Sequence, residues 1–251
     1  IGACVERLTE FRSFKAEVVD GPKDDVAPGP LALAFEDVRF SYNGAGPVLD
    51  GISFLVRPGT VLGLLGRTGS GKTTLARLIF RLYDVQTGSI RINGVDLREF
   101  QLSALRRNIS IVTQNVQLFR ASIRDNLTFF DRSIPDEHIL AVIDELGLRE
   151  WLDALPNGLD TKLQTGGRSI SAGEAQLLAF TRVFLRNPGL VILDEASSRL
   201  DPATEQLIER AIDKLLKNRT AIIIAHRLGT LHRTGEVMIL QARATIFATG
   251  G

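Results

Sequence analysis

The feature that most constrains the fold of this chain is the glycine-rich segment GRTGSGKT at residues 66–73. It follows the apolar run VLGLL and precedes TLARLIF, in which apolar residues recur at helical spacing. A strand that enters a helix through a tight glycine-rich turn is typical of α/β folds. Two later apolar runs, residues 190–193 and 221–225, have the continuity of strands covered on both faces. The sequence therefore predicts an α/β core with a mostly parallel sheet.

Two further parts are predicted around this core. The segments 31–42, 48–56 and 89–97 have strand patterns, and Asn93-Gly94 is a hairpin-turn signal, so an antiparallel β part is expected. From about residue 122 to 185 the pattern is mostly helical. Within it, Asp136 to Leu146 carries an apolar face that ends at Gly147, a residue suited to a helix C-terminus.

The N-terminal residues differ in composition from the rest. Residues 1–17 are amphipathic, and residues 18–30, VVDGPKDDVAPGP, have the Gly, Pro and Asp content of an extended linker. We therefore expect a compact domain over residues 31–251. The only cysteine, Cys4, cannot form an internal disulfide, which fits a reducing compartment. A net charge of +1 gives no global field that would favour a nucleic-acid partner.

The glycine-rich segment matches the pattern G-x-x-x-x-G-K-[ST] of a phosphate-binding loop, the P-loop. Its glycines allow backbone N–H groups to approach phosphate oxygens, and the following helix adds its positive dipole end. Lys72 is expected to reach the β- and γ-phosphates and Thr73 to hold Mg²⁺. The alternative is a glycine-rich turn without a ligand. The predicted nucleotide-binding residues of this segment are Gly66, Arg67, Thr68, Gly69, Ser70, Gly71, Lys72, Thr73 and Thr74.

Three more candidate site residues follow buried strands. Asp194 ends the run LVIL, where a P-loop enzyme needs a carboxylate on the Mg²⁺ side. Glu195 follows it and is free to polarise an attacking water, because adjacent strand residues point to opposite sides. His226 follows AIIIA, at the strand end where α/β folds place site residues. The alternatives are a strand cap for the two carboxylates and a packing role for His226.

With these motifs, the segment SISAGEAQLLAFTRVFLRNPGLVILDEASSRLD makes the chain resemble the nucleotide-binding domain of an ATP-binding cassette (ABC) transporter over residues 31–250. The resemblance implies a P-loop NTPase core, an antiparallel β subdomain and a helical subdomain that carries the signature. It further implies that Tyr42 stacks on adenine and that Gln114 contacts the γ-phosphate, Mg²⁺ and a membrane domain. It assigns catalysis to Lys72, Gln114, Glu195 and His226, metal binding to Thr73, Gln114 and Asp194, and contact with a partner's nucleotide to Ser171, Gly173 and Glu174.

The resemblance also implies how such a domain works. In the family, two domains sandwich two ATP molecules, each between one P-loop and the other domain's signature. Residues 1–30 resemble the end of an exporter's last membrane helix and its linker, which predicts a membrane domain on the same polypeptide and a place on the cytoplasmic face of a membrane. The alternatives are an importer subunit and an ABC ATPase without transport; no nucleic-acid partner is expected.

The signature departs from the family pattern, because LSGGQ is replaced by ISAGE. One interpretation is a capping box, in which Ser171 caps a helix and Glu174 reaches back to the Ser171 backbone. Glutamine would serve as well in that role, so Glu174→Gln is expected to change little. The other interpretation is a weakened signature that serves one site of a heterodimer. Whether the partner is a second copy or a different chain stays open.

Overall fold

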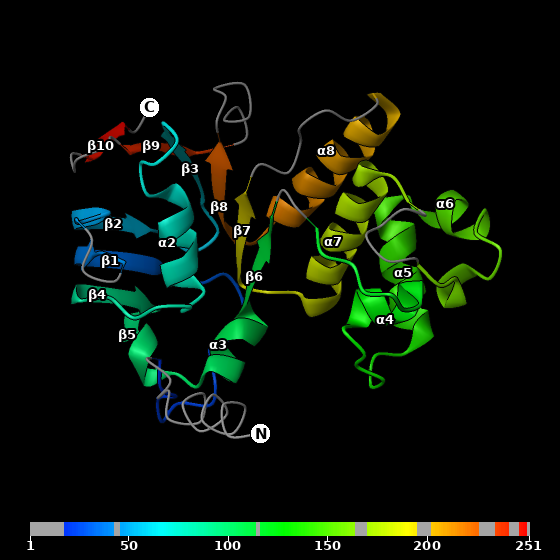
Figure 1. Cartoon of the computed structure of the whole chain (residues 1–251), viewed down its shortest axis with the longest axis horizontal. Helices are drawn as coiled ribbons and strands as arrows, with labels where there is room; N and C mark the ends of the chain where they lie inside the picture. The colour runs from blue at the N-terminus through cyan, green and yellow to red at the C-terminus, as the bar shows by residue number, and fades with distance from the viewer. Residues whose placement is uncertain are drawn as a thin grey trace, which may run out of the picture.

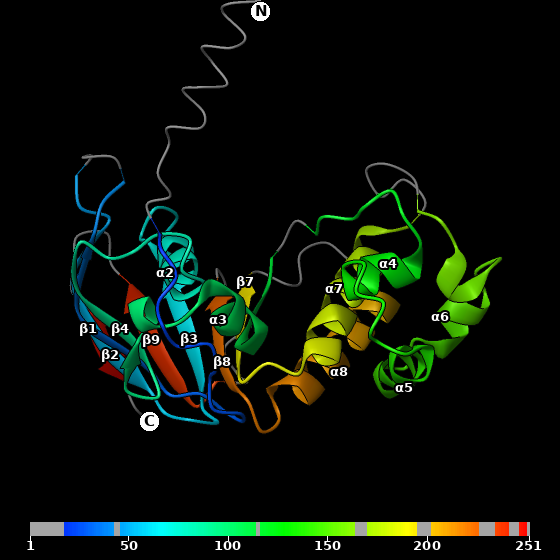
Figure 2. The same ribbon diagram turned by 90° about the horizontal axis from the view of Figure 1, so that it is seen from below.

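Two sheets and a group of helices make up the fold (Figure 1). The computed structural model describes residues 18–42, 46–113, 116–163, 170–194, 202–225, 234–240 and 246–249. Glu195, His226 and Gln114 lie outside these residues, as does the amphipathic segment 1–17. In Figure 2, the sheets lie to one side and the helices α4 to α8 to the other.

The larger sheet is the predicted parallel core. Its six strands run in the order β10-β9-β3-β8-β7-β6, and every pair is parallel except β10 and β9. Their bounds are β3 Val61–Gly66, β6 Ile109–Val112, β7 Leu190–Asp194, β8 Thr220–Ala225, β9 Glu236–Leu240 and β10 Ile246–Thr249. The apolar residues of β7, from Leu190 to Leu193, are all buried, as the continuous apolar run predicts.

The smaller sheet is antiparallel and has the order β2-β1-β4-β5. It consists of β1 Leu33–Phe40, β2 Leu49–Val56, β4 Thr87–Ile92 and β5 Val95–Asp96. Ile92 pairs with Val95 across Asn93 and Gly94, whose φ angles of 49° and 81° suit the predicted two-residue hairpin turn. Helix α2, Lys72–Ile79, buries its apolar residues in one core with both sheets.

The helical part has its own apolar core, which extends onto one side of the parallel sheet. Helix α5 spans the predicted residues and ends at Gly147 with φ of 72°. Contacts between α7 and each of α4, α5 and α8 hold the group together. The helices described here are α4 Ile123–Thr128, α5 Asp136–Leu146, α6 Arg149–Asp153, α7 Ala172–Arg186 and α8 Pro202–Leu216.

The described part of the predicted linker, from residue 18, is packed on the domain. Val26 is only 4% exposed and belongs to the core shared by the two sheets. Lys23 forms a parallel bridge with Phe100, with its N–H donating to Glu99 O at 2.8 Å and its carbonyl accepting from Gln101 N at 2.7 Å. These contacts join the linker to the short helix α3, Leu102–Asn108, and to the 3₁₀ turn Leu97–Glu99 before it.

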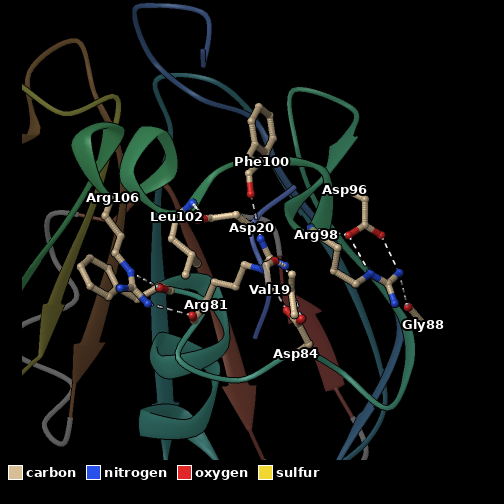
Figure 3. Close-up of polar contacts among 11 residues, drawn as sticks. Val19, Asp20, Arg81, Asp84, Gly88, Asp96, Arg98, Phe100, Leu102 and Arg106 are labelled. Atoms are coloured by element: carbon tan, nitrogen blue, oxygen red, sulfur yellow. Dashed lines mark hydrogen bonds and ion pairs between the residues drawn. The ribbon is translucent and has the colours of Figure 1, made fainter. Parts of the chain in front are cut away.

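Arg81 fastens this linker to the helix that follows the glycine-rich loop (Figure 3). It lies just beyond the end of α2 and is 2% exposed. Its guanidinium donates to Val19 O at 2.7 Å, Phe100 O at 2.8 Å and Asp84 Oδ1 at 2.9 Å. One buried cation therefore joins three segments that are far apart in the sequence.

We expect Arg81→Met to lower the free energy of unfolding by about 2–4 kcal/mol, because it leaves two carbonyls and a carboxylate without their donor. Urea denaturation with a spectroscopic readout measures this change. The matched control is Arg98→Met: Arg98 pairs with Asp96 but is 46% exposed, so the loss should be under about 1 kcal/mol. Equal losses in the two variants would contradict the account of Arg81.

Candidate nucleotide-binding site

The loop between β3 and α2 has the conformation that a phosphate-binding loop requires. Gly69 and Gly71 have φ angles of 84° and 95°, in the region that favours glycine. Gly71 is the N-cap residue of α2, and Lys72 is the first helical residue. Buried Lys72 lies over the loop, where its Nζ donates to Gly66 O at 2.5 Å and Arg67 O at 3.2 Å.

Several features of the loop suit an anionic ligand. Helix α2 has no side-chain cap at Gly71 and no acidic residue in its first turn. Its N-terminal N–H groups therefore have neither a capping side chain nor a first-turn carboxylate as acceptor. Ser70 Oγ is buried without a hydrogen-bond partner in the described structure. A Cβ placed on Gly69 would meet nothing within 4 Å, so the loop is open on that side. These residues fit a polyphosphate.

Tyr42 lies beside the first turn of α2. Its hydroxyl donates to Thr74 Oγ1 at 3.2 Å and accepts from Arg77 at 3.3 Å. Its ring packs edge-to-face on Phe40 and Tyr83, with centroids 4.9 Å and 5.2 Å away. The structure thus brings Tyr42, which follows β1, against the helix that begins at the glycine-rich loop. Its stacking on adenine stays a prediction.

The carboxyl ends of three neighbouring strands meet at the loop. Strand β8 lies between β3 and β7, and the register pairs Leu65 with Ala225 and Asp194 with Ile224. Because Ile224 also pairs with Leu64, Asp194 ends its strand level with Leu64, close to the start of the glycine-rich loop at Gly66. Glu195 directly follows Asp194 in the sequence and His226 directly follows Ala225, and both lie outside the described residues. Their roles stay predictions.

The capping box predicted at the signature is confirmed. Ser171 Oγ accepts from Glu174 N at 3.1 Å, and Glu174 Oε2 accepts from Ser171 N at 2.5 Å, at the N-terminus of α7. The other carboxylate oxygen, Oε1, accepts from Trp151 Nε1 at 2.7 Å. Gly173 is buried while Ser171 is exposed. Contact of Ser171, Gly173 and Glu174 with a partner's nucleotide stays a prediction.

A groove that sequence reasoning missed lies between β6 and the helical part. It has a volume of about 250 Å³, and its lining includes Thr113 and Val116, on either side of residues 114–115. The other lining residues include Phe119, Phe129, Arg182 and Arg186. Single aromatic residues in a sequence carry no signal of such a grouping, because Phe119 and Phe129 meet only through the tertiary fold.

Arg182 supports the wall of this groove. Its guanidinium donates to Asn126 O at 2.7 Å and Gln117 O at 3.0 Å, and lies 4.7 Å from the centre of the Phe129 ring. Burial lowers the pKa of Arg182 to about 10, and the nearby charge of Arg186 is the second, smaller cause of this shift. The guanidinium is therefore still charged at neutral pH. It joins α7 to α4 through Asn126 and to the loop before α4 through Gln117.

Comparison with known proteins places this fold and site in a family. The family model described as "ABC transporter" matches residues 49–198. The chain belongs to this family, as one of its ATP-binding, ATPase domains. Its relatives include exporters of this family.

The chain is 40% identical over 216 residues to an ATP-dependent lipid A-core flippase of Haemophilus influenzae, covering 85% of this chain and 37% of that protein. It is 39% identical over 244 residues to a β-(1→2)glucan export ATP-binding/permease protein of Rhodopseudomonas palustris, covering 96% and 40%. A solved bacterial Atm1-family ABC exporter with ATP bound matches with a TM-score of 0.86 and 31% identity, over 96% of this chain and 43% of that one.

The chain thus spans about two fifths of the length of these relatives. Among the helices of the described residues, none combines the length and the hydropathy that a membrane crossing requires. The relatives are membrane transporters, so this chain corresponds to one part of them.

Proposed function

We propose that this chain binds and hydrolyses ATP and that the reaction drives export of a substrate across a membrane. The observation that carries this proposal is the meeting of the glycine-rich loop, the uncapped N-terminus of α2 and Asp194 at one edge of the parallel sheet. The similarity to an exporter with ATP bound supports it.

In this proposal, the backbone N–H groups of the loop and Lys72 Nζ hold the β- and γ-phosphates. Thr73 and Asp194 would hold Mg²⁺, which supplies charge neutralisation on the phosphate oxygens. Glu195 accepts a hydrogen bond from a water and orients it toward the γ-phosphorus, and His226 contacts the γ-phosphate. The water oxygen bonds to phosphorus while Glu195 takes up one of the water protons. The bond from phosphorus to the β–γ bridging oxygen breaks with its electron pair on that oxygen, and ADP and phosphate leave.

The partner in this reaction is a second nucleotide-binding domain. The N-terminus of α7, where the Ser171 side chain is exposed and Gly173 is buried, is the part of the chain that would contact the partner's γ-phosphate. Binding then closes the two domains around ATP, and hydrolysis removes the γ-phosphate contacts and lets them open. A second copy of this chain is the simplest partner, because its loop, Asp194 and signature are all present.

A membrane domain is the second proposed partner, with the nucleotide-binding domain on the cytoplasmic face of the membrane. The fused ATP-binding/permease relative and the share of its length covered here support a membrane domain on the same polypeptide. The groove lined by Thr113, Phe119 and Phe129 is the docking surface that we propose for it. Phe119 and Phe129 line this groove and are 44% and 42% exposed. Phe130, which is 50% exposed, packs edge-to-face on Phe119, as Phe129 does.

Phe130→Asp tests this docking surface. The change places a charge at the groove rim, so it should weaken co-purification of the 251-residue chain with its membrane domain, produced as a separate polypeptide, by about ten-fold or more. ATP binding by the chain alone should be unchanged, because Phe130 is not at the glycine-rich loop. The matched control, Leu55→Asp, changes an equally exposed apolar residue on β2. Co-purification that is unaffected by Phe130→Asp would contradict the assignment.

A further inference from the structure

Glu174, the fifth residue of the signature, is hydrogen-bonded to a residue of another helix. Both carboxylate oxygens of Glu174 accept hydrogen bonds from within the chain: Oε2 from Ser171 N at 2.5 Å and Oε1 from Trp151 Nε1 at 2.7 Å. The backbone N–H and the indole N–H can only donate. The two donors therefore require a side chain that presents two acceptors.

Glutamine, the residue of the family pattern, does not meet that requirement. Its amide has one acceptor oxygen and one donor nitrogen, so the nitrogen would face either Ser171 N or Trp151 Nε1, donor against donor. Glutamine could accept from both donors only if its one oxygen accepted both hydrogen bonds. From the sequence alone we expect glutamine to replace Glu174 at little cost. That expectation takes only the capping box into account. The hydrogen bond from the Trp151 indole changes it, because glutamine cannot accept from both donors with separate oxygens.

Trp151 connects Glu174 to the body of the helical part. It lies on α6 and packs against the helical core, and α6 contacts α5 and the 3₁₀ turn Gly158–Asp160. Its hydrogen bond therefore spans 23 residues and joins two separate helices. The carboxylate sits in the first turn of α7, where the helix dipole also favours a negative charge.

We propose that Trp151 is a positioning residue for the signature: it holds Glu174, and through it the N-terminus of α7, in the orientation that receives the nucleotide of the partner domain. The inference rests on the proposed function, because it concerns the surface that closes on ATP. It also implies that the tryptophan, the only one in the chain, reports on the signature by its fluorescence.

The test uses four variants of the 251-residue chain carrying Glu195→Gln: Trp151→Phe, Glu174→Gln, both together, and Arg149→Gln. Arg149 lies on the same helix as Trp151 but pairs with Asp144, away from the signature, and is the matched control. The readouts are the ATP concentration that gives half-maximal dimer, by light scattering, and the affinity of the P-loop for a fluorescent ATP analogue.

Trp151→Phe and Glu174→Gln should each raise the half-maximal ATP concentration by about three- to ten-fold. The double change should raise it no further than the larger single change, because both remove the same link. Analogue binding should stay constant in all four variants, and Arg149→Gln should match its parent. Dimerisation that Trp151→Phe leaves unchanged, or effects that multiply in the double variant, would overturn the proposal.

Tryptophan emission supplies a readout that needs no dimer. In the chain without nucleotide, Glu174→Gln should shift the emission of Trp151, whereas Arg149→Gln should not. An unshifted spectrum would overturn the proposal even if the chain dimerises. A parent chain that never dimerises with ATP counts against the proposed function instead, and the emission comparison still decides whether Trp151 holds Glu174.

Discussion

Replacing Glu195 by glutamine is expected to lower the rate of ATP hydrolysis by about 10²–10⁴-fold, the range that a positioned general base contributes. Glutamine has nearly the same shape but a weakly basic oxygen, so it can orient the water without taking up its proton. Asp194, which ends β7 near the start of the glycine-rich loop, is not altered by this change. Steady-state release of phosphate measures the rate.

ATP affinity is the control for this variant. Because Glu195 acts on the water in our account and not on the nucleotide, the dissociation constant for ATP should change less than about three-fold. Hydrolysis that continues at the parent rate would show that another group activates the water. A loss of ATP affinity as large as the loss of rate would place Glu195 among the binding residues.

Removing the ammonium group of Lys72 is expected to weaken ATP binding by about 100-fold or more and to abolish measurable hydrolysis. Lys72 is buried at the N-terminus of α2 beside the loop carbonyls, and in our proposal its ammonium group forms charged hydrogen bonds with the β- and γ-phosphates. Truncating one partner of a buried, charged hydrogen-bonded pair costs about 2–5 kcal/mol. Titration calorimetry of Lys72→Ala with ATP measures the change.

Lys217→Ala is the matched control for the Lys72 variant, since Lys217 is exposed just beyond α8. Its ATP affinity should equal that of the parent. Thermal unfolding separates a binding defect from a folding defect, because Lys72→Ala also removes two hydrogen bonds to the loop. Retained ATP affinity in folded Lys72→Ala protein would contradict the assignment of the glycine-rich loop.

The parts of the fold that are set by local chemistry could be predicted from the sequence. Asn93 and Gly94 adopt positive φ angles in a two-residue hairpin, and Gly147 ends α5 with a left-handed conformation, because few other residues adopt these conformations at low cost. The capping box at Ser171 is likewise confined to one helical turn. The phosphate-binding loop followed from its glycines and the strand and helix that flank it.

Contacts between distant segments could not be predicted in this way. Trp151 meets Glu174 because α6 packs near the start of α7, and nothing in the spacing of 23 residues indicates the contact. Arg81 reaches Val19 over 62 residues, which is why the linker is more closely packed on the domain than its composition suggests. Both pairings depend on how the helices and sheets pack together.

The most direct test of the central claim is the mass of the Glu195→Gln chain in solution, by size-exclusion chromatography with light scattering, with ATP and with ADP. Our account predicts a dimer with ATP and a monomer with ADP, because only the γ-phosphate joins the P-loop of one domain to Ser171 and Gly173 of the other. A chain that binds ATP and remains a monomer would contradict the claim that two copies close around the nucleotide.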